Sequence, residues 1–205
     1  MARLTRSESQ ARTRADLIAT ARDLFLTDGY AKTSMERVAE EAGYSKGAVY
    51  SNFRTKKDLC LEVLEDIHAT KFGEVSELIA ADESLEVRLA RLQEWAERTL
   101  GDVGWTMLEF EFATLSRDDP DLRAALVSNL GAVRGAVAAQ LQTLADSLRL
   151  VLPMPAEDAA STVLSLGLGL GIQRAIDPSL SARLITDAVR LLLSVAERST
   201  PLGAE

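Results

Sequence analysis

The feature that most constrains the fold is a stretch at residues 33–59, TSMERVAEEAGYSKGAVYSNFRTKKDL, in which short helical patterns are separated by a glycine and by capping residues. Thr33 followed three residues later by Glu36 has the spacing of a capping box, which predicts a helix that begins at Ser34. Gly43 tolerates the positive φ that closes a helix, so we expect this helix to end there.

A second short helix is expected directly after the glycine. Ser45 can cap its first turn, while Val49 and Phe53 supply apolar contacts on its inner side. Its other side carries hydroxyl, amide and ammonium groups, which can meet phosphate oxygens or base edges of DNA. Two helices joined by about three residues form the arrangement in which the second helix enters a major groove. The stretch therefore predicts a helix-turn-helix.

A third helix start lies just beyond, at Thr55, which is a suitable cap. Lys56, Lys57 and the positive end of that helix could then face phosphate groups. The residues that we expect to contact double-stranded DNA are Thr33, Ser34, Ser45, Lys46, Gly47, Tyr50, Ser51, Asn52 and Lys56.

At these positions the chain resembles the TetR family of transcriptional regulators. The family pattern, which covers about the first quarter of the chain, is filled by Thr33, Ser34, Val38, Ala39, Ala42, Gly43, Ser45, Gly47, Val49, Tyr50, Phe53, Lys56 and Leu59. Three positions depart from it. Met35 stands where some relatives have a base-reading arginine, Tyr44 replaces a small aliphatic residue, and Asn52 stands where histidine or tyrosine is common.

The charge distribution agrees with a DNA-binding N-terminus. The net charge of -8 would by itself argue against a nucleic-acid partner, because phosphate repels an acidic protein. However, residues 1–57 have a net charge of +4, and residues 58–205 have a net charge of -12. The arginine-rich start, which includes Arg3, Arg6, Arg12 and Arg14, is open to two interpretations: a solvated tail, or a segment that contacts DNA.

Helical periodicity continues to the end of the chain. The first helix ends at Gly29, and further helices are predicted at 56–80, 85–100, 103–116, 119–148, 156–175 and 180–197. The prediction is an all-α protein with a three-helix helix-turn-helix domain at 1–55. A larger helical domain at 56–205 would bind a ligand and form a homodimer, as the resemblance implies.

Aromatic residues and methionine are concentrated in the larger domain, although only 5% of the chain is aromatic. Such side chains accept varied apolar shapes, so the group favours a chamber for a small-molecule effector. For any one of them, an ordinary place in the core is the alternative. The predicted ligand-binding residues are Phe72, Trp95, Trp105, Met107, Phe110 and Phe112.

The last two helices are candidates for the dimer interface. Gly167, Gly169 and Gly171 lack the spacing and following residues of a phosphate loop, so we interpret them as sites of close approach by another helix. The resemblance implies a four-helix interface between two copies. Its expected members are Leu164, Leu168, Ile172, Leu184, Ala188, Leu191 and Val195. The apolar repeat of 119–148 fits either a coiled-coil seam or a bundle helix within one subunit.

These features favour a ligand-responsive regulator, most simply a repressor released from its operator by a small apolar molecule. A transcriptional activator of the same fold and a ligand-independent architectural DNA-binding protein remain alternatives. Cys60 and His68 have no spaced partners, so we predict no enzyme, catalytic residue, metal site or cofactor. The single cysteine, the absence of a signal peptide and the shortness of the apolar run at 166–172 predict a cytoplasmic protein without a membrane partner.

Overall fold

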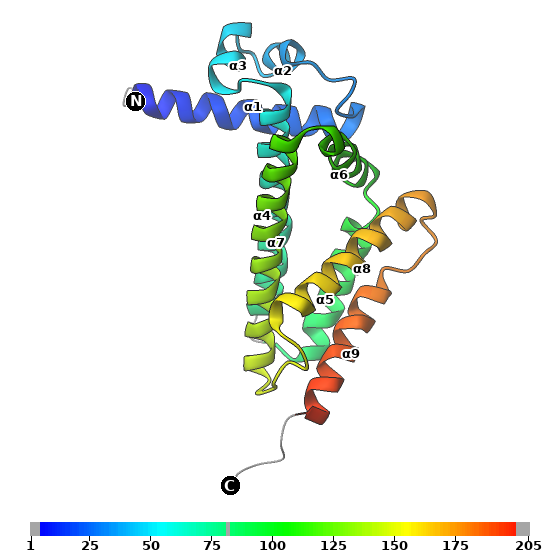
Figure 1. The fold of residues 1–205 in the computed structure, drawn as a ribbon. Coiled ribbons are helices and arrows are strands. Elements are labelled where there is room, and N and C mark those ends of the chain that lie inside the picture. Colours follow the sequence, from blue (N-terminus) through cyan, green and yellow to red (C-terminus); the bar gives the residue numbers. More distant parts are fainter. Residues whose placement is uncertain (1–4, 81–82, 200–205) are drawn as a thin grey trace. The chain divides into compact units, whose positions relative to one another are not determined.

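The computed structural model describes residues 5–80 and 83–199, and the regular elements in these ranges are all helical (Figure 1). They are α1 (Arg6–Asp28), α2 (Met35–Glu41), α3 (Lys46–Asn52), α4 (Lys56–Ala80), α5 (Leu85–Thr99), α6 (Val103–Leu115), the short 3-10 helix η1 (Ser116–Asp118), α7 (Pro120–Ser147), α8 (Ala156–Ile176) and α9 (Arg183–Ser199). The all-α prediction is confirmed, and the helix ends lie close to those expected from caps, glycines and prolines.

The chain forms two compact units. The N-terminal unit combines residues 1–67 with residues 103–127, and the C-terminal unit combines residues 68–102 with residues 128–205. Both α4 and α7 run from one unit into the other. This division differs from the predicted boundary after residue 55, because α6 packs against α1 although the two helices are far apart in the sequence.

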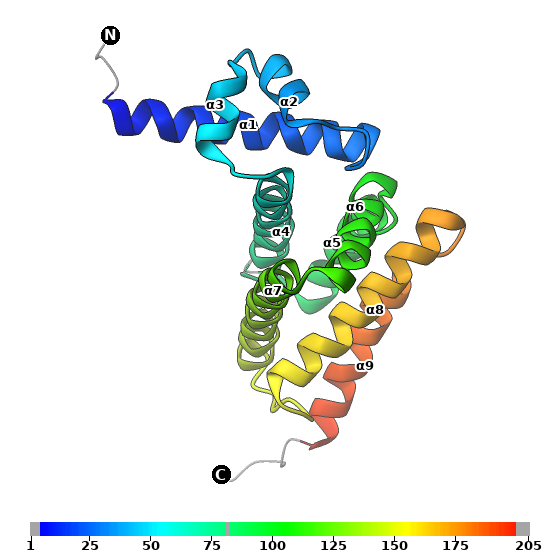
Figure 2. The ribbon, with the colours of Figure 1, turned by 45° about the horizontal axis from the view of Figure 1, so that its top comes forward.

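The core of the N-terminal unit is built on the inner side of α1, where Leu17, Ala21 and Phe25 are buried. Figures 1 and 2 show α2 and α3 on one side of this helix, and both contact it. Leu108 and Phe112 of α6 complete the same core. The periodic apolar residues of α1 thus pack against helices from both sequence segments of the unit, and α1 supports the helix-turn-helix.

Arg14 fixes the far end of α3 to this support. Its guanidinium donates a hydrogen bond of 2.6 Å to the carbonyl of Asn52, forms an ion pair with Glu62 and lies 4.4 Å from the ring centroid of Phe53. One side chain of α1 therefore contacts the end of α3, the residue after it and the body of α4. Arg14 has a structural role, whereas Arg6 and Arg12 are exposed and Arg3 lies outside the described residues.

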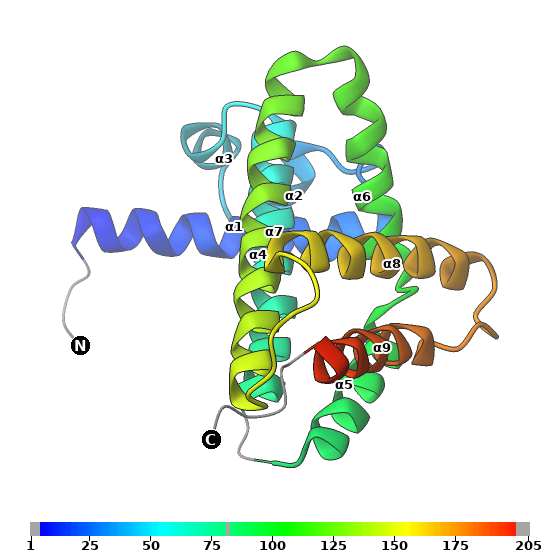
Figure 3. The ribbon, with the colours of Figure 1, turned by 60° about the horizontal axis from the view of Figure 1, so that its bottom comes forward.

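In the C-terminal unit, α8 and α9 run antiparallel and side by side (Figure 3), and α9 also packs on α5. A buried arginine, Arg174, joins these helices. Its guanidinium donates to the carbonyl of Leu100 at 2.8 Å and pairs with the Glu97 carboxylate at 2.9 Å. It also donates to the carbonyl of Leu180, in the turn before α9. Carbonyls at the end of α5, which have no partner within that helix, are satisfied in this way.

Apolar surface remains uncovered on α8. By length and composition, α7 and α8 both resemble membrane-spanning helices, a test that core helices of soluble proteins also pass. Only 22% of the most apolar stretch of α8 is buried in the single chain, and Leu168 and Ile176 are 48% and 77% exposed. An apolar surface of this kind indicates an interaction site, since water contact with it is unfavourable.

Candidate DNA-binding interface

The local signals of the helix-turn-helix act as predicted at most positions. Ser34 caps α2 by accepting the backbone N–H of Arg37 at 3.1 Å, and Ser45 caps α3 by accepting that of Ala48 at 3.2 Å. Gly43 has a φ of 74° in the turn between them. Thr55 and Asp58 form a reciprocal capping pair at the start of α4, which confirms the third predicted cap.

Thr33 is a correction. We expected it to form the capping box and to contact DNA, but its side chain is completely buried. Its hydroxyl donates to the carbonyl of Gly29 at 3.0 Å, and Ser34 is the cap instead. Thr33 therefore connects the loop to the end of α1, and it is left out of the proposed interface because no DNA atom could reach it.

The outer side of α3 carries the expected polar groups. Lys46, Gly47, Tyr50 and Ser51 are exposed, whereas Val49 is fully buried against the core. Lys46 and Tyr50 lie four residues apart and so share one side of the helix, with the Lys46 ammonium 5.9 Å from the tyrosine ring centroid. Buried and exposed positions thus alternate with the helical period, and α3 presents one polar side to the solvent.

Asn52 is less available than the sequence suggested. Its side-chain N–H donates to the carbonyl of Ala48 at 2.8 Å, and its side-chain oxygen is buried. Asn52 instead lines a polar groove between α3 and the first turns of α1, together with Ser7, Gln10, Ala11, Arg14 and Ser51. The contribution of α1 to this surface was missed, because spacing within the sequence does not show which turn of α1 lies beside α3.

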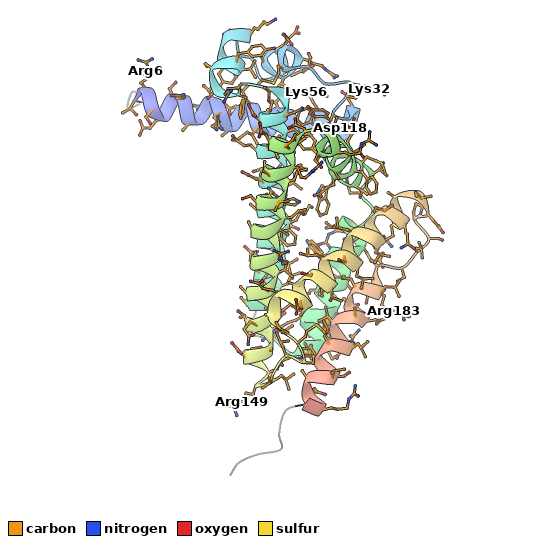
Figure 4. The ribbon with its side chains drawn as sticks, in the orientation of Figure 1. Arg6, Lys32, Lys56, Asp118, Arg149 and Arg183 are labelled. Carbon is orange, nitrogen blue, oxygen red and sulfur yellow. The ribbon has the colours of Figure 1, made fainter. Side chains whose placement is uncertain are left out.

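Lys56 is a second correction. We expected its ammonium to face a phosphate group, but it points back to the loop before α2. It donates to the carbonyls of Tyr30 and Thr33 at 2.8 and 3.0 Å and lies 4.0 Å from the centroid of the Tyr30 ring. Figure 4 labels Lys56 at the start of α4, with Lys32 in the neighbouring segment after α1. Lys56 is therefore a link between α4 and that loop.

Glu36, which was expected to complete a capping box with Thr33, instead lies on the exposed surface beside α3. The Glu36 carboxylate of α2 accepts a hydrogen bond from the Tyr50 hydroxyl at 3.1 Å and pairs with the Lys46 ammonium at 2.6 Å. The contact with the Lys46 ammonium, followed by a hydrogen bond with the backbone of Glu36 itself and then by the Tyr50 hydroxyl, lowers the pKa of Glu36 to about 2. The neighbouring Met35, which stands where some relatives have a base-reading arginine, is only 5% exposed and packs in the core.

The predicted ligand-binding residues are divided between the two units. Phe72 and Trp95 belong to the C-terminal unit, in which the Trp95 indole N–H donates to Glu74 at 2.8 Å. Phe112 is completely buried in the N-terminal core, with its ring edge against Tyr30 at a centroid distance of 5.0 Å. Trp105 packs on the same core, whereas Met107 and Phe110 are 43% and 50% exposed. The six residues therefore do not form one cluster within either unit.

The predicted interface residues of α8 and α9 fall into two groups. Leu168, Leu184 and Leu191 are 48%, 48% and 63% exposed. The half-buried residues are Leu164, Ile172, Ala188 and Val195, of which Leu164 packs within its own chain. A Cβ atom added at Gly167 or Gly169 would meet no other atom within 4 Å, so another helix has room to approach there.

Cys60 and His68 lie in separate structural environments. Cys60 is fully buried, and burial raises the pKa of its thiol, so the reactive thiolate is disfavoured. The Nδ1 atom of His68 is 2.9 Å from the side-chain oxygen of Asn129. The structure thus gives Cys60 the role of a small apolar core residue.

The geometry of α2 and α3, with capped helix starts, a glycine turn and a polar outer side, is that of a helix-turn-helix, the element with which many proteins enter the major groove of DNA. Residues 17–63 match the family described as "Bacterial regulatory proteins, tetR family". The similarity to the TetR family is thus found in this segment of the chain.

Two relatives show how the similarity is distributed. The transcriptional regulator TtgR of Pseudomonas putida is 39% identical over 70 residues, which cover 34% of this chain and about a third (33%) of TtgR. The transcriptional repressor AcnR of Corynebacterium efficiens is 26% identical over 144 residues, 70% of this chain and 72% of AcnR. The higher identity thus extends over only about a third of this chain, and the longer match has the lower identity.

Solved structures extend the similarity of fold to nearly the whole chain. A TetR-family transcriptional regulator from Mesorhizobium loti has a TM-score of 0.70 and 22% identity, with 94% of this chain and 98% of that chain covered. A transcriptional regulator from Saccharomonospora viridis in complex with choline has a TM-score of 0.65 and 22% identity, with 90% and 96% covered. At this identity the comparison shows the fold and nothing more.

Proposed function

We propose that this protein is a cytoplasmic transcriptional regulator that binds an operator as a homodimer through α3. The observation that carries the proposal is the outer side of α3, where Lys46, Tyr50 and Ser51 are exposed while Val49 anchors the helix in the core. Ammonium and hydroxyl groups in this arrangement can donate to phosphate oxygens and base edges. The names of the relatives support regulation, and that of AcnR supports repression.

The uncovered side of α8 and α9 supports the homodimer. Leu168, Leu184 and Leu191 give these two antiparallel helices an exposed apolar surface, and Gly167 and Gly169 leave room for close approach. A surface of this kind is self-complementary when two copies are related by a two-fold axis. Such an axis would place two copies of α3 in successive major grooves, about 34 Å apart.

The effector site is proposed for the C-terminal unit, as a site for a small apolar molecule whose binding releases the operator. Phe72 and Trp95 are the predicted ligand residues that lie in this unit. The fold accommodates a small molecule in one neighbour, which was crystallised with choline. Because α4 runs through both units, a ligand that binds better to one packing of α4 would change how DNA is read.

The proposal is tested by selecting binding sites from a library of random duplexes with the purified full-length protein. The expected result is enrichment of an inverted repeat whose half-sites are about one helical turn apart, bound by two chains. Tyr50→Ala and Ser51→Ala should each weaken binding to the enriched site, while Arg98→Ala, at an exposed position of the C-terminal unit, serves as the control. A library without enrichment, or binding by one chain at a single half-site, would overturn the proposal.

A further inference from the structure

The exposed surface of the helix-turn-helix contains a carboxylate among the groups that should face DNA. Glu36 of α2 lies 2.6 Å from the Lys46 ammonium, and both side chains are accessible, at 45% and 67% of their surface. The same carboxylate accepts the Tyr50 hydroxyl at 3.1 Å. Two of the three donors assigned to the outer side of α3 are therefore already engaged by one acidic side chain.

This arrangement has a cost for contacts with the DNA backbone. A lysine bound to a carboxylate contributes no net positive charge to its surroundings, and it must leave the carboxylate before it can neutralise a phosphate group. Binding to DNA of arbitrary sequence comes almost entirely from such neutralisation and from the release of counterions. An uncompensated carboxylate left beside phosphate groups would in addition be repelled.

We propose that Glu36 is a specificity-determining residue, which holds Lys46 and Tyr50 in the absence of an operator and thereby weakens binding to DNA of unrelated sequence. The inference rests on the proposed function of α3. At an operator, a base-edge amino group, such as the N4 group of cytosine, could donate to the Glu36 carboxylate in place of Lys46. On DNA without a matching donor, phosphate groups would repel the free carboxylate. Breaking the Glu36–Lys46 pair would then cost binding free energy that no new contact to Glu36 returns.

The contact is maintained over the physiological pH range. Its hydrogen bonds lower the pKa of Glu36 and raise the pKa of Lys46, in each case through the partner first. Both groups consequently remain charged near neutral pH. The restraint on Lys46 should depend on salt, because ions screen a pair as exposed as this one.

The experiment measures the affinity of the full-length protein, by fluorescence anisotropy across salt concentrations, for the enriched operator and for a scrambled duplex of equal length. Glu36→Gln should bind the scrambled duplex about twofold to fivefold more tightly, a modest gain because an exposed ion pair is weak. Its slope of log K against log[salt] should be steeper by about 0.9, since Lys46 then neutralises one more phosphate group. The ratio of operator to scrambled affinity should fall.

Two controls separate the inference from a general effect of charge. Glu41→Gln removes the same charge from another exposed position of α2 and should strengthen binding to the scrambled duplex less than Glu36→Gln does. In a Lys46→Met background, Glu36→Gln should lose its effect on the scrambled duplex, because the lysine that it releases is absent. Circular dichroism and thermal unfolding establish that each variant is folded.

Unchanged or weaker binding of the scrambled duplex by Glu36→Gln would overturn the inference, and would show that Glu36 positions Lys46 and Tyr50 for binding. A gain equal to that of Glu41→Gln, or one that persists in the Lys46→Met background, would overturn it as well. These outcomes leave the proposed function intact, since the wild-type protein still binds its operator. Failure of the wild-type protein to bind any duplex overturns both.

Discussion

Removal of the Lys56 ammonium should destabilise the N-terminal unit, even though the sequence places this lysine among the DNA contacts. Lys56→Met keeps most of the side-chain stem and removes only the charged donor. The ammonium donates to two backbone carbonyls, of Tyr30 at 2.8 Å and of Thr33 at 3.0 Å, and lies over the Tyr30 ring. The variant therefore tests one group whose partners all belong to the loop before α2.

The magnitude follows from these partners. A hydrogen bond to a charged group contributes about 1.5–3 kcal/mol, and a cation–π contact at a partly exposed site about 0.5–1 kcal/mol. The contacts share one ammonium and are not additive, so we expect a loss of about 2–3 kcal/mol. Lys57→Met is the matched control at the next position. Lys57 pairs with Asp119 near the surface, where water and salt weaken an ion pair, so the loss of this pair should cost less than the loss of the Lys56 contacts.

The assay is urea unfolding in a Trp95→Phe background, in which Trp105 is the remaining tryptophan and reports on the N-terminal unit. The Lys56→Met midpoint should fall well below that of Lys57→Met. At urea-free conditions where the variant remains folded, the salt dependence of its DNA binding should equal that of the wild type. A fully stable Lys56→Met with a salt slope lower by about 0.9 would refute the structural role and restore a phosphate contact.

Two further predictions concern the same unit. Gly104→Ala should destabilise it by about 1–3 kcal/mol, measured by thermal or urea unfolding, because the added Cβ would lie 2.3 Å from the carbonyl oxygen of Leu26. Gly73→Ala, at a helical glycine with no such neighbour, should instead stabilise the protein by up to about 1 kcal/mol; equal effects of the two changes would contradict the close packing of α6 on α1. The free energy of unfolding should also fall as the pH rises above 9.0, because burial raises the pKa of the Cys60 thiol and raises that of Tyr30 from 10.0 to about 12. The folded state retains these protons at pH values where the unfolded state has lost them. The contribution to stability is therefore complete below the pKa values of the unfolded state and is lost as the pH rises through those of the folded state. Tyr30→Phe should lose less stability than the wild type between about pH 10 and about pH 12, and identical pH profiles for the two proteins would count against this origin.

The sequence by itself determined the features that depend on neighbours along the chain. The caps at Ser45 and Thr55 and the positive φ of Gly43 are set by groups within a few residues, and each is found where it was predicted. The cap of α2 is Ser34, one residue after the predicted Thr33. Helical periodicity likewise indicated the long helices, and capping residues, glycines and prolines indicated their approximate ends. The buried side of α3 and its exposed side followed from the same rule, since positions three and four residues apart share one side of a helix.

The tertiary structure decided which of these residues are available to a partner. Thr33 and Lys56 fit the family pattern, yet one is buried and the other donates to two loop carbonyls. Glu36 meets Lys46 only because the turn at Gly43 folds α2 back beside α3. Phe112 packs on Tyr30 although 82 positions separate them in the chain. Local hydrogen bonds are encoded within one helical turn, whereas burial and charge pairing depend on which distant surfaces meet, and one sequence read along its length does not contain that information.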